Sequence, residues 1–376
     1  MSKVSTLQGQ KVSTPQSQLE EFEQRLASKS LGGHWQMVQQ MRRTEELHPI
    51  VWRWADILVS LETAGRLIEI GRADDENDRR TIHLVNPGLS DLRYTSGIMQ
   101  VTVQLIKPSE SAEAHRHSQN ALRFVIDAAE GMYTTVDGEK VLMERGDLVL
   151  APNWTWHDHT NTSASRPAIW IDILDVNLLR RMEAHFKEVW PDGPLQPVVR
   201  QDGYTQKRFG SVRPRTAVGT DRWIPFGYKW ADALNTLNEL ARDGEQDLHE
   251  GIYLEYVNPC TGGWAFPTLN CRLQMLPPRS KTRSLRRVGI TFYHVFGGRG
   301  NTVVGPGEGG GVDDNGRTPS KARDTQTLHW EKNDCFMVPS WRWQEHQNLS
   351  DEPVFLFSVT EQPALEAFGW YREERA

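Results

Sequence analysis

Apolar residues recur at helical spacing in two stretches near the N-terminus. The first stretch runs from Gln18 to about Glu46, and the second runs from Ile50 to Leu67. This periodicity predicts that the N-terminal region is mostly helical. Residues 1–14 are rich in Ser, Thr, Gln and Lys and lack large apolar groups, so little offsets the entropy of ordering them. They are expected to form a loose tail.

After Thr81 the pattern changes to short β-rich runs. The runs are 98–106, 122–126, 140–143 and 148–150, and NPG, DGE and RGD turn signals interrupt the region. A second β-rich stretch extends from Tyr253 to Thr360, and a helix-like stretch from about Tyr228 to Arg242 separates the two. The chain therefore reads as helices, a β module, a helical linker and a second β module.

The two β modules resemble each other. The segment from Gly146 to Asn161 aligns without a gap with the segment from Asn333 to Asn348, and both contain Pro-x-Trp-x-Trp. Repeats of this kind indicate the architecture of the whole chain. We expect an all-β core of two jelly-roll barrels produced by internal duplication. The expected boundaries are 1–82 for the tail and helical region, 83–180 for the first barrel, 181–252 for the linker and 253–376 for the second barrel.

Charge and composition exclude several classes of protein. The 376 residues contain 43 Lys and Arg against 49 Asp and Glu, and this net charge of -6 argues against a nucleic-acid partner. The three cysteines have no close spacing, so they form neither a disulfide framework nor a Cys-based zinc site. The chain has no apolar h-region near its start and no run of the ~18 apolar residues that a membrane span needs. We therefore expect no membrane contact and a cytoplasmic location.

Histidines are concentrated in two short segments of the first module. His115-Arg116-His117 and His157-Asp158-His159 hold four of the 12 histidines. Residues i and i+2 of a strand share one face, so His115 and His117 would project together, with Arg123 further along that face. An inward pair of imidazoles costs desolvation unless it is hydrogen-bonded or bound to a metal. Imidazole suits iron, zinc, copper and nickel, which predicts a metal site.

These segments resemble cupin motifs, and the match is closer at family level. EAHRHSQNALRF, WTWHDHTN and, in the second half, YVNPCTGG resemble the gentisate 1,2-dioxygenases and their salicylate and 1-hydroxy-2-naphthoate relatives. The resemblance covers about Ile50 to the C-terminus. It implies a bicupin fold and a homo-oligomer, usually a tetramer. It also implies an enzyme that uses Fe(II) and O2 to open a small aromatic acid between its carboxyl-bearing and hydroxyl-bearing carbons.

Carried over to this sequence, the resemblance makes His115, His117 and His157 the ligands of one Fe(II) per chain, with O2 as co-substrate. The residues support that choice, because the segment 118–122 has no acid that could complete a competing two-histidine, one-carboxylate site. His159 lies two positions past the last ligand, so an acid/base role is expected for it.

The substrate-binding residues are expected around this centre. Arg123 could bind the substrate carboxylate with its forked guanidinium, unless it pairs with a structural acid. The family alignment points to Gln104 and to an arginine at Arg79 or Arg80. Asp172 could orient a histidine, with Asp175 as a rival. Family members commonly have small residues where this chain has Thr102, so its ring-substituent preference is left open among gentisate and substituted salicylates.

The second module lacks the ligands. Gln344 occupies the position of His157, and 285–287 occupies that of the first histidine pair, so a structural role is expected. Two other functions remain open for the first module. One is a zinc or nickel cupin enzyme, because three histidines also serve catalytic zinc. The other is a non-catalytic cupin that binds a small aromatic acid.

Overall fold

A computed structural model of the chain describes residues 15–36, 47–76, 78–210, 224–305 and 325–376. It divides into a small unit, Met1–Glu46, and a larger unit, Leu47–Ala376. The small unit contains α1 (Pro15–Ala27). After this helix the chain turns back, and Trp35 stacks on Phe22 of the helix with 6.0 Å between ring centroids. A helix is therefore present in the predicted stretch, but it begins at Pro15 and ends at Ala27, and residues 28–33 are not helical. Residues 1–14 and 37–46 lie outside the described residues.

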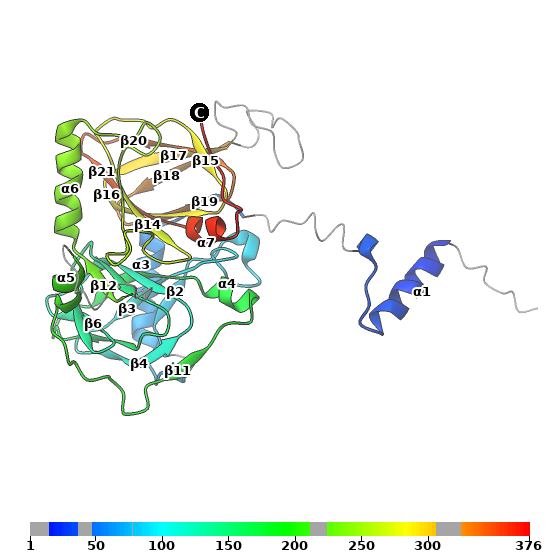
Figure 1. The fold of residues 1–376 in the computed structure, drawn as a ribbon, viewed down its shortest axis with the longest axis horizontal. Helices are drawn as coiled ribbons and strands as arrows, with labels where there is room; N and C mark the ends of the chain where they lie inside the picture. The colour runs from blue at the N-terminus through cyan, green and yellow to red at the C-terminus, as the bar shows by residue number, and fades with distance from the viewer. Residues whose placement is uncertain (1–14, 37–46, 77, 211–223, 306–324) are drawn as a thin grey trace, which may run out of the picture. The chain divides into compact units, whose positions relative to one another are not determined.

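The first half of the larger unit forms two sheets with antiparallel pairing (Figure 1). A six-stranded sheet has the order β12-β8-β5-β10-β3-β2 and a five-stranded sheet has the order β11-β4-β9-β6-β7. The strands of the six-stranded sheet are β2 (Thr81–His83), β3 (Gln100–Ile106), β5 (Ala121–Asp127), β8 (Leu148–Ala151), β10 (Ala168–Leu174) and β12 (Phe226–Tyr228). Those of the five-stranded sheet are β4 (Ser111–His117), β6 (Met132–Val136), β7 (Glu139–Leu142), β9 (His157–Asn161) and β11 (Lys187–Val189).

The second half forms another pair of sheets with a corresponding order of strands. They are β1-β19-β16-β21-β14-β13 and β18-β17-β20-β15-β22. The six-stranded sheet contains β1 (Ile50–Trp52), β13 (Ile252–Glu255), β14 (Asn270–Leu276), β16 (Thr291–Gly297), β19 (Cys335–Val338) and β21 (Val354–Thr360). The five-stranded sheet contains β15 (Leu285–Arg287), β17 (Arg299–Gly305), β18 (Gln326–Glu331), β20 (Trp343–Asn348) and β22 (Glu373–Arg375). The β-rich core that the sequence predicts is thus present in both halves.

The helices are few and short. They are α3 (Trp54–Leu67), the 3-10 turn η1 (Pro87–Leu89), α4 (Val176–Arg181), α5 (Tyr204–Phe209), α6 (Trp230–Asp243) and α7 (Gln362–Ala367). In the part of the chain that is described, none of them is both long and apolar enough to cross a bilayer.

Two boundaries differ from the helical prediction, and for the same reason. Ile50–Trp52 is strand β1, and helix α3 begins only at Trp54, because the backbone of Arg53 is extended and β1 pairs with β19 of the second half. Tyr228, predicted as the start of a helix, belongs to β12, which pairs with β8 of the first half. Strand β1, which precedes the first half in the sequence, therefore joins the six-stranded sheet of the second half. Strand β12, which precedes the second half, joins the six-stranded sheet of the first half.

A buried aspartate fixes each of these exchanged segments. Oδ1 of Asp334 accepts a hydrogen bond of 2.7 Å from the N–H of Trp54 at the start of α3. In the same way, Oδ1 of Asp147 accepts a bond of 3.0 Å from the N–H of Trp230 at the start of α6. A carboxylate there satisfies a free N–H and interacts favourably with the helix dipole. The two halves are consequently interlocked through α3 and α6.

The largest apolar core lies between the two six-stranded sheets. Phe124 of β5 stacks on Phe357 of β21 with 4.0 Å between ring centroids, and both belong to one cluster of buried side chains that spans the two halves. On β5, Leu122, Phe124 and Ile126 contribute to this shared core. The alternation of a strand then turns Arg123 to the opposite face, toward the five-stranded sheet of the first half. That inner space holds the candidate site.

Candidate active site

The histidine pair of β4 is directed inward by an irregularity of the strand. The register between β4 and β9 shifts between Ala112 and His115, as in a β-bulge, which re-aims the side chains that follow. His115 and His117 are both buried, whereas Arg116 between them faces outward and pairs with Glu188. The shared face that the i, i+2 spacing predicts is therefore present and lies inside the sheets.

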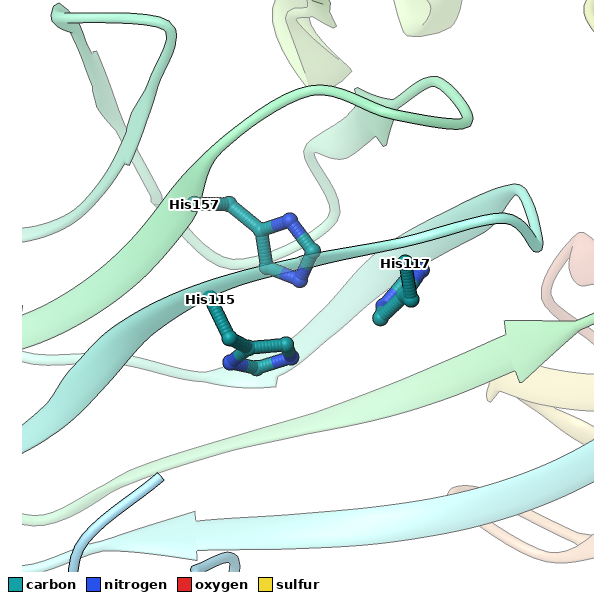
Figure 2. A group of neighbouring side chains, drawn as sticks. All are labelled: His115, His117 and His157. Atoms are coloured by element: carbon teal, nitrogen blue, oxygen red, sulfur yellow. The ribbon is translucent and has the colours of Figure 1, made fainter. Parts of the chain in front are cut away.

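His157 completes a triad with this pair (Figure 2). It is the first residue of β9 and lies opposite His115 in the strand register. Its ring centroid is 4.5 Å from that of His115 and 4.7 Å from that of His117. One ring nitrogen of each histidine lies within 4.8 Å of the others, and this is the group among the described residues whose ligand atoms could hold a metal ion.

The ring orientations of His117 and His157 suit metal binding. Nδ1 of His117 lies 2.9 Å from the carbonyl oxygen of Gln119, and Nδ1 of His157 lies 3.0 Å from that of Thr155. These carbonyls hold the proton on Nδ1 and leave the Nε2 lone pair for a metal. Burial lowers the pKa of His117 to about 3 and holds the pKa of His157 well below its usual value, so both rings are neutral at neutral pH.

The triad opens into a pocket of about 240 Å³. Its lining combines the triad with polar and charged side chains from both sheets of the first half. These are Asp78, Arg79, Thr81, His83, Gln100, Thr102, Gln104, Gln119, Arg123, His159, Asp172, Arg180, His185 and Lys187, with Leu174 and Val176 as the apolar members. Six of the predicted site residues besides the triad belong to this lining, namely Arg79, Thr102, Gln104, Arg123, His159 and Asp172.

Arg123 and Asp172 form a buried pair in the pocket, which is the alternative that the sequence left open for Arg123. Nη1 of Arg123 nevertheless has no hydrogen-bond partner among the described residues. The two residues are opposite each other on β5 and β10, and Nε of Arg123 lies 3.2 Å from Oδ1 of Asp172. Oδ2 of Asp172 accepts a hydrogen bond of 2.8 Å from the indole of Trp170. Both carboxylate oxygens therefore have partners other than a histidine. Asp172 lines the pocket as expected, but the predicted hydrogen bond to a histidine is absent among the described residues.

The rival carboxylate, Asp175, also has other partners. It accepts hydrogen bonds from the backbone and side-chain amides of Asn120. It contacts the hydroxyl of Thr268 in the second half as well. Asp175 thus connects the loop after the histidine pair to the other half and does not orient a ligand.

Three further predicted residues lie in the pocket. Gln104 and Thr102 are on the inner face of β3, and Nε2 of Gln104 is buried with no hydrogen-bond partner among the described residues. His159 is also buried, with its ring centroid 5.0 Å from that of Trp170, and its Nδ1 is likewise without a partner in the described chain. A buried polar atom that has no protein partner is available to form a hydrogen bond with a ligand.

Of the two candidate arginines, the structure brings only Arg79 to the pocket. Nη2 of Arg79 lies 2.5 Å from Nδ1 of His115 and donates a bond of 2.9 Å to the carbonyl of Glu113. Arg80 points away from the pocket, so Arg79 is the one of the two alternatives that lies there. Both of its terminal nitrogens donate to Glu110 at 2.8 Å, so its charge is already neutralised. The two arginines lie directly before β2, and their side chains point to different partners, His115 for Arg79 and Glu110 for Arg80.

Sequence reasoning missed a basic group at the outer end of the pocket. His83, Arg180, His185 and Lys187 line it, and the last two lie in the stretch that was expected to be a helical linker. No motif marks these residues. The signal that could have found them is the concentration of basic residues between Arg180 and Lys187, although such clusters are usually solvated surface.

The second half has no such centre in its described residues. Gln344 accepts a hydrogen bond of 3.1 Å from the hydroxyl of Tyr293. Arg287, two residues after Leu285 on β15, forms a buried ion pair with Glu250. The residues at the positions of the ligands are thus engaged with other side chains of the second half.

Comparison with known proteins agrees with this geometry. Residues 102–174, which include the triad, match the cupin domain family. The chain is 33% identical to a 5-aminosalicylate 1,2-dioxygenase from Comamonas sp. over 96% of this chain and 91% of the relative. It is 32% identical to gentisate 1,2-dioxygenase 1 from Aquipseudomonas alcaligenes over 94% of this chain and 96% of the relative.

Similarity extends to the three-dimensional structure. Salicylate 1,2-dioxygenase from Pseudoaminobacter salicylatoxidans, in its adduct with gentisate, superposes with a TM-score of 0.82 and 30% identity. The alignment covers 99% of this chain and 97% of that protein. Both the sequence and the fold therefore match along nearly the whole length. The chain belongs to the gentisate and salicylate family of ring-cleaving 1,2-dioxygenases, which are oxidoreductases of cupin fold.

Proposed function

We propose that the protein is an Fe(II)-dependent dioxygenase that opens a 2-hydroxybenzoate, either gentisate or a substituted salicylate, between its carboxyl-bearing and hydroxyl-bearing carbons. The observation that carries this proposal is the position of Arg123 in the same pocket as the His115, His117 and His157 triad. A metal and a fixed cation in one small pocket suit a chelating aromatic acid. Relatives that act on 5-aminosalicylate and gentisate support the substrate class.

Iron fits the three donors. Neutral imidazoles suit Fe(II) as well as zinc and nickel, and three protein ligands leave coordination positions open. Bound there, Fe(II) would supply the redox chemistry toward O2 that the ring alone lacks. We propose one Fe(II) per chain, held in the first cupin, and none in the second. Iron analysis after anaerobic loading should give about one equivalent, and His115→Ala with His157→Ala should remove it.

The other pocket residues would bind and orient the substrate. Arg123, aligned by Asp172, would bind the substrate carboxylate through its guanidinium, and Nε2 of Gln104 would donate to a substrate oxygen. His159 would hold a proton or hydrogen bond at Nδ1 next to the reacting oxygen atoms. Arg79 would add positive charge beside His115, and Thr102 would limit which ring substituents fit.

We further propose that the fold is a bicupin derived by duplication, with one barrel built on 83–180 and a second, structural barrel built on 253–376. Strands β1, β11 and β12, from the segments expected to be helical, are added to these barrels. The corresponding strand order supports this interpretation, as does a repeated hydrogen bond. The N–H of Trp154 donates to the carbonyl of His117 at 2.8 Å, and the N–H of Trp341 donates to that of Arg287 at 2.7 Å. Both tryptophans have a positive φ, 62° and 60°.

We also propose a homo-oligomer, a tetramer, in the cytoplasm, with a small aromatic acid as the partner. Light scattering coupled to size exclusion would measure the mass of the assembly. A mass equal to that of one chain would contradict the oligomer without affecting the proposed reaction.

Labelled oxygen tests the reaction. Gentisate, salicylate, 5-substituted salicylates and 1-hydroxy-2-naphthoate are supplied separately to the Fe(II)-loaded enzyme with ¹⁸O₂. We expect both oxygen atoms in a ring-opened oxo-diacid, with no added reductant. A requirement for NADH, or one labelled atom in the product, would indicate a monooxygenase. Activity restored by zinc or nickel without O2 consumption would favour a different cupin enzyme, and tight binding without turnover would favour a binding protein.

A further inference from the structure

Four basic side chains form a cluster at the outer end of the pocket. We call His83, Arg180, His185 and Lys187 the mouth cluster. They come from the end of β2, the last turn of α4, the loop that follows it and the start of β11, yet they line the same pocket as the histidine triad. The cluster is therefore assembled by the fold from separate segments.

The acidic groups of the pocket do not neutralise this cluster fully. The lining contains two carboxylates, Asp172 and Asp78. Asp172 pairs with Arg123, and Oδ2 of Asp78 lies 2.5 Å from Nζ of Lys187. Arg180 has no carboxylate partner in the described part of the chain, and its guanidinium lies 5.9 Å from the ring centroid of Tyr94. The mouth thus retains positive charge although the chain as a whole carries -6.

The two histidines of the cluster lie within reach of the charge of Arg180. Burial lowers the pKa of His83 and of His185, and the positive charge of Arg180 lowers both further. A neutral imidazole presents one N–H donor, and His83 uses its donor on the backbone of Arg93, which leaves the N–H of His185 for a ligand. A guanidinium with neighbouring N–H donors is a suitable environment for a carboxylate or sulfonate.

A single row of cross-strand neighbours in the six-stranded sheet leads from Arg123 to the mouth cluster. Arg123 is opposite Asp172, Asp172 is opposite Thr102, and Thr102 is opposite His83. With neighbouring strands about 4.8 Å apart, the row from β5 to β2 spans about 14 Å between backbones. Side chains extend inward from both ends of this row. A single aromatic ring whose carboxylate is bound at Arg123 therefore directs its far edge toward the mouth cluster.

We propose that Arg180, assisted by His185, binds a second anionic group on the far edge of the substrate ring. The proposal rests on the proposed function and refines its substrate class to 2-hydroxybenzoates that carry a further carboxylate or sulfonate. In this arrangement Arg123 binds one end of the substrate and Arg180 binds the other.

A pair of ligands of equal size and different charge tests the proposal. 5-Carboxysalicylate and 5-carbamoylsalicylate are titrated by calorimetry, under argon, into the Fe(II)-loaded enzyme, and kcat/KM is measured separately in air. The wild type should bind the carboxylate roughly tenfold more tightly than the carbamoyl compound, as expected for a charge-assisted contact. Arg180→Gln should reduce this ratio to about one, whereas the wild-type ratio should persist in Arg181→Gln, which removes an equal charge from the same helix.

Three outcomes would overturn the proposal: equal affinities in the wild type, an equal loss of preference in both variants, or an equal loss of affinity for both ligands in Arg180→Gln. The last would indicate general attraction of anions. Cleavage of gentisate or salicylate without the charge preference would reject this inference and leave the proposed function intact. Absence of any cleavage would reject the function, and the calorimetric ratio would still decide the inference.

Discussion

Arg123 and Asp172 are cross-strand neighbours whose side chains form a buried ion pair, 3.2 Å from Nε to Oδ1, inside the pocket. Neither partner is more than one-tenth exposed. A pair in such surroundings restricts the guanidinium to one orientation, and Trp170 restricts the carboxylate in turn. Asp172 therefore acts on the substrate through Arg123 and is a positioning residue.

Asp172→Asn should separate this role from the orientation of a histidine. The change leaves a buried arginine without its charge partner, so the free energy of unfolding should fall by about 3 kcal/mol. Loss of orientation should lower kcat/KM by roughly tenfold. Iron content should stay near that of the wild type, as measured by metal analysis. Loss of iron from this variant would instead support the role in histidine orientation that the sequence predicted.

Arg123→Lys tests recognition of the substrate carboxylate. Lysine keeps the charge but loses the planar fork, so kcat/KM should fall by about tenfold or more while iron stays bound. Arg116→Lys is the matched control, because Arg116 lies between two proposed ligands but faces outward against Glu188. Steady-state kinetics that are unchanged in Arg123→Lys, or equally impaired in the control, would reject the assignment.

His159→Phe tests the group beside the triad. Phenylalanine fills similar space against Trp170 but cannot hold a proton or a hydrogen bond at Nδ1. We expect kcat to fall by roughly a hundredfold or more with iron content nearly intact. A variant that loses iron would show that the ring only supports the metal site.

Glu110→Gln tests whether Arg80 has a structural role. It leaves the buried guanidinium of Arg80 unpaired, so the free energy of unfolding should fall by about 3 kcal/mol, measured by urea denaturation. The KM for the aromatic acid should not change. Glu69→Gln removes an exposed partner of Lys107 and should cost less than about 1 kcal/mol. A raised KM in Glu110→Gln, without loss of stability, would return Arg80 to the list of substrate contacts.

Asp334→Ala and Asp147→Ala test the exchange of segments between the halves. Each change removes the acceptor at the start of one helix, and either should lower the free energy of unfolding by roughly 1–3 kcal/mol. Hydrogen exchange should then locate the effect. Asp334→Ala should lower protection in β1 and α3, and Asp147→Ala in β12 and α6. The same loss of protection in both variants would contradict separate attachment.

The sequence by itself determined that both halves are β-rich and that His115 and His117 share one face of a strand. Alternation of polar and apolar residues over 100–105 is a local property, because successive side chains of a strand point to opposite faces. The i, i+2 spacing of His115 and His117 likewise ensures that both rings share one face in any strand. These features need no knowledge of distant residues, and the structure confirms them.

Only the tertiary structure decided what each face contacts. The apolar face of β3 and β5 packs on the other half, so the polar face, with Thr102 and Arg123, becomes the interior of the pocket. The local sequence pattern cannot tell which face of β3 or β5 packs on the other half and which lines the pocket, because both faces are buried. The same limit explains why Ile50–Trp52 was predicted as helix, since its conformation depends on pairing with β19, almost 300 residues away. It also explains the mouth cluster, whose members meet only when β2, α4 and β11 surround one pocket.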